Sequence, residues 1–170
     1  MNGPAVTLTV SAVDDRELRL RRSFAAPREL VFDAFTKPEL LVRWYGARGW
    51  NLVGCDVDLR VGGAYRFVSR GPGGEEMAQG GVFREVEPPA RLELTEVFDE
   101  QSYPGETLIR HDFEAADGVT TVTSTVRYAT PEGRATVLRY PMARGVAEGT
   151  ERLDALLRSV STDSSRGERS

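Results

Sequence analysis

Residues 138–160 read LRYPMARGVAEGTERLDALLRSV. From Leu138 to Val160 the apolar side chains recur every three or four residues, which is the spacing of one face of an α-helix. Pro141 lacks the backbone N–H that a helix interior needs, so we expect a kink or a new helix start there. The segment predicts the longest helix of the chain, with an apolar stripe that another element must cover.

The region before this helix, residues 50–128, has the pattern of successive β-strands. Its apolar runs are separated by turn sequences that include Gly62-Gly63, Pro104-Gly105 and Asp117-Gly118. Six strands joined by hairpins fit the region. The strongest hairpin signal is Asp117-Gly118, because both residues tolerate a positive φ.

Residues 17–24 alternate apolar and charged side chains, which predicts a first, half-buried strand. Two short helices follow, opened by Pro27 and Pro38 and ended by Gly46 and Gly49. This order predicts an α+β fold. A curved, seven-stranded antiparallel sheet wraps around the long C-terminal helix, and a cavity remains wherever inward side chains leave space.

The composition is that of one globular domain. The chain has 170 residues, of which 40% are apolar and 28% charged. We expect one domain over residues 16–160, a flexible segment at 1–15 and a disordered tail at 161–170. With a net charge of −4 and scattered arginines the protein would repel a phosphate backbone, so we expect no nucleic-acid partner.

Targeting signals are not expected in this sequence. We identify no signal peptide and no apolar run near the roughly 20 residues that a membrane span needs. The single cysteine, Cys55, cannot form an internal disulfide, which is compatible with a reducing compartment. We therefore expect a cytoplasmic protein.

Strand parity indicates which side chains share the apolar face of the sheet, because alternate residues of a strand point to the same side. The predicted inward sets are Val53, Cys55, Val57 and Leu59; Leu92, Leu94, Glu96 and Phe98; Ile109, His111 and Phe113; and Val122, Ser124, Val126 and Tyr128.

Glu96 and His111 are the ionisable members of these sets. A desolvated glutamate has a raised pKa, and an inward histidine can move protons, so the two are candidate catalytic residues. The alternatives are a hydrogen-bonding role toward a ligand and a structural role near a sheet edge or cavity mouth.

No metal site is expected. One histidine and one cysteine cannot build an ordinary zinc site, and Asp56-Val57-Asp58 lacks the ligand count of a calcium loop.

Four segments, in order along the chain, resemble one known family. They are residues 24–35 (FAAPRELVFDAF), 44–46 with 58–67 (WYG and DLRVGGAYRF), 81–92 (GVFREVEPPARL) and 142–157 (MARGVAEGTERLDALL). The chain resembles the heat-shock-protein ATPase activator homologue (AHSA-like) family of the START and birch-pollen-allergen-like (SRPBCC) superfamily over about residues 17–160. The resemblance implies the helix-grip fold and a hydrophobic cavity between the sheet and the last helix. Ala47 stands where the family often has proline, so we expect a different loop over the pocket mouth.

Members of this superfamily carry lipids, bind hydrophobic natural products, cyclise polyketides or contact a chaperone. Our leading hypothesis is non-enzymatic binding of a small hydrophobic or aromatic molecule, without a cofactor. One alternative is a cyclase or hydrolase-like enzyme that uses Glu96 and His111 on a polyketide-like substrate. Another is a chaperone-associated or regulatory interaction module, and the resemblance also makes a homodimer a candidate assembly. The predicted cavity lining comprises Trp44, Tyr65, Phe67, Glu96, His111, Tyr128, Met142 and Val146.

Overall fold

The computed structural model describes residues 8–167, which form eight β-strands and four α-helices. The strands are β1 (Thr9–Ala12), β2 (Glu17–Phe24), β3 (Asn51–Val57), β4 (Ala64–Arg70), β5 (Glu76–Glu87), β6 (Arg91–Phe98), β7 (Thr107–Ala116) and β8 (Val119–Arg127). The helices are α1 (Arg28–Thr36), α2 (Pro38–Trp44), α3 (Pro131–Leu138) and α4 (Met142–Gly167).

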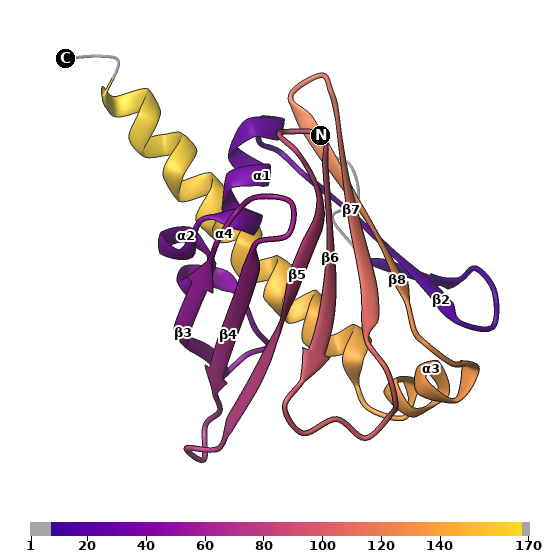
Figure 1. Ribbon diagram of the computed structural model, residues 1–170. Helices are drawn as coiled ribbons and strands as arrows, with labels where there is room; N and C mark the ends of the chain where they lie inside the picture. Colours follow the sequence, from indigo (N-terminus) through magenta and orange to yellow (C-terminus); the bar gives the residue numbers. More distant parts are fainter. Residues whose placement is uncertain (1–7, 168–170) are drawn as a thin grey trace.

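All strand pairs are antiparallel, in the order β1-β2-β8-β7-β6-β5-β4-β3. Figure 1 shows the sheet curling about α4, with α1 and α2 packed toward one end of the molecule and α3 at the other. The predicted α+β helix-grip architecture is confirmed. No helix within the described residues combines the length and the hydropathy needed to cross a membrane.

The turn between β7 and β8 is the one that the sequence predicted. Asp117 and Gly118 have φ values of 53° and 77°, and Ala116 pairs directly with Val119 across the turn. Positive φ at both central residues matches the right-handed twist of the two strands. The hairpin joins the centre of the sheet to β2.

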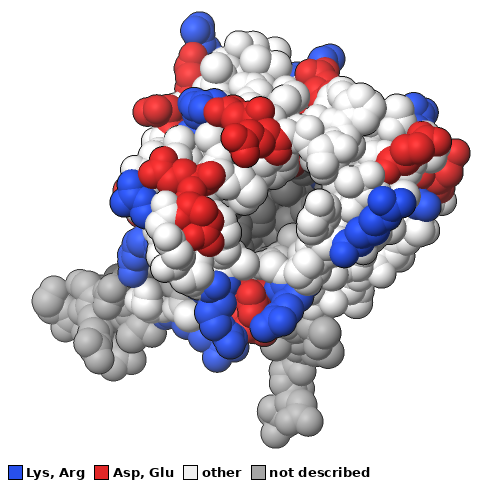
Figure 2. Space-filling view, turned by 90° about the horizontal axis from the view of Figure 1, so that it is seen from below, with Lys and Arg blue, Asp and Glu red and all other residues white. Residues whose placement is uncertain are grey.

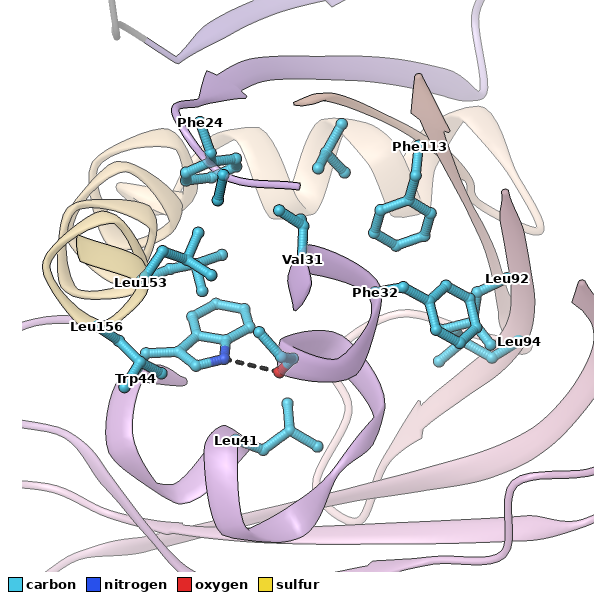
Figure 3. Close-up of a cluster of buried hydrophobic side chains, with 14 of the residues drawn as sticks. Phe24, Val31, Phe32, Leu41, Trp44, Leu92, Leu94, Phe113, Leu153 and Leu156 are labelled. Carbon is cyan, nitrogen blue, oxygen red and sulfur yellow. Dashed lines mark hydrogen bonds between the residues drawn. The ribbon is translucent and has the colours of Figure 1, made fainter. Parts of the chain in front are cut away.

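The main core lies where α1, α2 and α4 meet the sheet (Figure 3). Phe32 of α1 meets Phe113 of β7 edge to face, with ring centroids 5.3 Å apart. The indole N–H of Trp44 donates to the carbonyl oxygen of Ala34 at 2.8 Å, which joins α2 to α1. Several residues of this core, Trp44, Leu92 and Leu94 among them, also border the open space between the sheet and α4.

Two boundaries differ from the sequence predictions. The sheet has eight strands instead of seven, because Thr9–Ala12 pairs with β2 in the segment that we expected to be flexible. The last helix continues to Gly167, whereas we expected a disordered tail from Ser161. A helix that is already nucleated adds further residues at little cost, even without apolar side chains. Residues 1–7 and 168–170 lie outside the described residues.

Parity fails in β3, where a register shift lies between Leu52 and Gly54. A bulge inserts one extra residue and turns the following side chains to the other face. Leu52 is buried while Val53 is 49% exposed, so the inward assignment of Val53 is wrong. Leu59 follows the end of the strand and is 38% exposed, which corrects its assignment too.

Candidate functional site

A cavity of about 590 Å³ lies between the concave face of the sheet and α4. Its wall includes β2, β4 to β8, α4, and the β6–β7 loop at Glu100–Tyr103. Figure 2 shows the molecule hollowed at the end where this loop and α3 lie. Pockets of 300–1,000 Å³ are the size that binds small molecules.

Every residue predicted from the sequence to line a cavity borders this one. They are Trp44, Tyr65, Phe67, Glu96, His111, Tyr128, Met142 and Val146. In two of them the polar group is already hydrogen-bonded within the protein. The Trp44 N–H donates to the carbonyl oxygen of Ala34, and the Tyr65 hydroxyl donates to the carbonyl oxygen of Thr95 at 2.6 Å. These two side chains therefore present apolar surface to the cavity.

Glu96 belongs to a polar cluster on the cavity wall. The side-chain amide of Gln79 donates to Glu96 Oε2 at 2.9 Å and to the Tyr45 hydroxyl oxygen at 3.0 Å. Glu96 follows Leu92 and Leu94 on the inward face of β6, so its carboxyl group is withdrawn from bulk water although part of it faces the cavity. Burial raises the pKa of Glu96 to about 7. Near neutral pH the carboxyl group can both donate and accept hydrogen bonds.

His111 lies in a different part of the wall. One ring nitrogen, Nδ1, is 2.7 Å from the hydroxyl oxygen of Ser124, and the ring centroid is 5.0 Å from that of Phe35. Burial lowers the pKa of His111 to about 4, so the ring is neutral at pH 7. His111 is a fixed hydrogen-bonding and packing group of the wall.

The structure does not bring Glu96 and His111 together. Glu96 pairs with Thr107 and His111 with Leu92, so they are four positions apart along the two strands. At about 3.3 Å per residue this separates them by roughly 13 Å. At this separation the two side chains cannot exchange a proton directly.

Sequence reasoning missed several polar residues of the wall, among them Arg22, Gln79 and Tyr45. Arg22 could have been found, because Leu18, Leu20 and Phe24 share its parity on β2 and are buried. Gln79 and Tyr45 gave no such signal, since Gln79 lies in a stretch of β5 without apolar alternation and Tyr45 follows the end of α2.

Metal ligands are not clustered in the described part of the chain. No group of three or more histidine, cysteine, aspartate or glutamate side chains there is placed to share an ion. Burial raises the pKa of the Cys55 thiol to about 11, so it is protonated at neutral pH.

An antiparallel sheet curled around a long helix, with a cavity between the two, defines a helix-grip protein. A family model described as "Activator of Hsp90 ATPase homolog 1-like protein" matches residues 25–158. The match spans well over half of the chain, and the protein belongs to this family.

Solved structures agree with this assignment. A crystal structure of a Rhodobacter sphaeroides protein is 35% identical, with a TM-score of 0.85 over 90% of this chain and 99% of that one. A Mycobacterium smegmatis protein is 26% identical, with a TM-score of 0.80 over 90% of this chain and 99% of that one. A Nitrosomonas europaea protein is 27% identical, with a TM-score of 0.80 over 89% of this chain and 99% of that one. No curated protein was found to match the sequence.

Proposed function

We propose that this protein binds a small apolar or aromatic molecule in the cavity between the sheet and α4. The observation that carries the proposal is the cavity of about 590 Å³, with a mostly apolar wall and a few polar side chains. Burial of apolar ligand surface contributes roughly 25 cal/mol per Å². Family membership supports a ligand-binding or Hsp90-regulator-like module, and the cavity favours ligand binding.

The cluster of Tyr45, Gln79 and Glu96 orients the ligand under this proposal. Gln79 is 4% exposed and donates to both neighbours, so it holds them in place. The Tyr45 hydroxyl accepts that hydrogen bond and keeps its own proton to donate. A ligand with one polar group would bind with that group toward this cluster or toward another polar part of the wall.

A second candidate function, catalysis, draws on one observation, which is the Glu96 pKa of about 7. General acids and bases work best with a pKa near the working pH. Under this alternative Glu96→Gln abolishes conversion of a bound compound, followed by mass spectrometry, and leaves binding within about tenfold. Under the binding proposal wild type and Glu96→Gln both return every bound compound unchanged.

The binding proposal is tested by closing the cavity. Val146 lines it from α4, whereas Ala143 is exposed on the same helix. The measurement is thermal unfolding of wild type, Val146→Phe and Ala143→Phe against a library of apolar and aromatic compounds. A compound at about 100 times its Kd stabilises the protein that binds it by about 2.7 kcal/mol, which raises the unfolding midpoint by roughly 5–10 °C.

We expect such compounds to stabilise wild type and Ala143→Phe, and to lose their effect on Val146→Phe. Equal stabilisation of all three proteins would place the compounds outside the cavity. An absence of stabilisation across the whole library would contradict ligand binding.

A further inference from the structure

Arg22 is a buried cation on the wall of the cavity. It lies on β2 between Leu20 and Phe24, at the parity of the inward, apolar side chains. Only 6% of its surface is exposed. Arginine is rarely buried to this degree unless a partner compensates its charge.

The guanidinium group of Arg22 has no hydrogen bond or ion pair with any other described residue. Its Nε is buried and unsatisfied, and its guanidinium carbon lies 5.1 Å from the ring centroid of Phe24. Burial lowers the pKa of Arg22, because desolvation disfavours the charged form. An unpaired donor of this kind is costly unless another molecule supplies the acceptor.

The nearest carboxylates are already paired elsewhere. The negative charges of Asp154 and Glu151 on α4 favour the charged form of Arg22. Asp154 forms its ion pair with Arg158 at 3.0 Å, and Glu151 pairs with Arg48 at 3.7 Å. Arg158 also acts on Arg22 through its positive charge. The one cation among these described residues without a contacting carboxylate is Arg22, so a monoanion matches it best.

Arg22 and Glu96 lie at separate ends of the wall. Arg22 pairs with Val122, which pairs with Phe113, whereas Glu96 pairs with Thr107. Phe113 and Thr107 are six positions apart on β7, or roughly 20 Å along the strand. An anion at Arg22 is therefore distant from the carboxyl group of Glu96.

We propose that the ligand is an amphipathic monocarboxylic acid, whose carboxylate binds the guanidinium of Arg22 and whose apolar body fills the cavity. The planar fork of N–H donors matches a carboxylate through two parallel hydrogen bonds. This inference rests on the proposed function, since it names the ligand class of the same cavity. It adds a recognition residue that determines which apolar molecules bind.

The test compares decanoate with decanol, which share an apolar chain and differ in charge. Isothermal titration calorimetry measures both on wild type, Arg22→Met and Arg21→Met. Arg21 is the matched control, because it is the next residue of β2 and is exposed. We expect Arg22→Met to weaken decanoate binding by about 10- to 100-fold and to leave decanol binding within about threefold. Arg21→Met should behave as wild type with both compounds.

The outcomes separate the two proposals. Unchanged decanoate affinity in Arg22→Met, with decanol still bound, overturns the role of Arg22 and leaves ligand binding intact. Failure of wild type to bind either compound overturns this inference, while the proposed function then stands or falls on the compound library.

A measurement on wild type alone covers the case in which Arg22→Met does not fold. Decanoate labelled with ¹³C at its carboxyl carbon is titrated by NMR while bound. We expect the bound carboxyl group to titrate at a lower pH than free decanoate, because the guanidinium favours the anion. Titration at a higher pH would place the head group in apolar surroundings and overturn the inference.

Discussion

The surroundings of two residues in the cavity wall shift their pKa values away from the ordinary ones. Glu96 has its pKa raised to about 7, and His111 has its pKa lowered to about 4. Desolvation is the main cause of both changes, and it favours the neutral form of each group. The wall at neutral pH therefore carries a neutral imidazole, a partly protonated carboxyl group and the guanidinium of Arg22.

Glu96 makes the free energy of unfolding depend on pH. The folded-state pKa is raised, so between about pH 4.5 and 7 the folded protein keeps a proton that the unfolded chain releases. The contribution is fully present below pH 4.5 and is lost as pH rises through 7. We expect wild type to lose up to about 2–3 kcal/mol relative to Glu96→Gln between pH 4.5 and 8. Urea unfolding across this range measures the difference, and two parallel pH profiles would contradict the burial of Glu96.

His111 gives a direct spectroscopic test, because it is the only histidine in the chain. A folded-state pKa of about 4 means that the ring stays neutral from pH 8 down to about pH 5.5. We expect its ring-proton NMR signals not to shift over this interval. A titration midpoint near 6.5, the ordinary value for histidine, would show that the ring is hydrated.

At the scale of elements, α4 is fixed against the loop that follows Tyr45. Arg152 donates to the carbonyl oxygen of Trp50 at 2.7 Å and to Asn51 Oδ1 at 2.9 Å. Gly149 meets the same loop, and a Cβ added there would lie 3.3 Å from the carbonyl oxygen of Gly46. A Cβ at Gly145 would meet only the Cβ of Ala47, at 3.6 Å.

The two glycines of α4 should therefore respond to substitution in opposite ways. Gly145→Ala removes a poor helix former at ordinary contact distance and should stabilise the protein by up to about 1 kcal/mol. Gly149→Val forces a branched side chain against backbone and should destabilise it by about 1–3 kcal/mol. Urea unfolding checks both, and equal effects at the two sites would show that α4 does not approach the loop closely.

The elements differ in how far they could be predicted from the sequence. Long periodic segments and the Asp117-Gly118 hairpin were predictable, because pattern and turn chemistry are local. The short edge strand β1 and the bulge at Val53 were not, since pairing partners and register depend on the rest of the sheet. The same limit applies to the site, where parity identified Glu96 and His111 but not the bridging Gln79.

For the molecule as a whole, the helix-grip arrangement divides the interior into two parts. The main core around Phe32, Trp44 and Phe113 is buried, and Figure 3 shows its side chains gathered between the helices and the sheet. The remainder of the space between sheet and α4 stays open as the cavity, reached from the hollowed end in Figure 2. The fold is thus stabilised at one end while the other end is available for a ligand.

Assembly and cellular location stay predictions from the sequence. The expected homodimer and the cytoplasmic location rest on resemblance and composition. The described wall residues include Leu8, which lies before residue 16, the expected start of the domain.

The central claim is that one apolar molecule occupies this cavity. Native mass spectrometry of wild type, Val146→Phe and Ala143→Phe, each mixed with the best-stabilising compound of the library, tests it most directly. We predict a single bound molecule per chain on wild type and Ala143→Phe, and none on Val146→Phe. A bound molecule on Val146→Phe would contradict the claim, and so would the absence of any bound molecule on wild type.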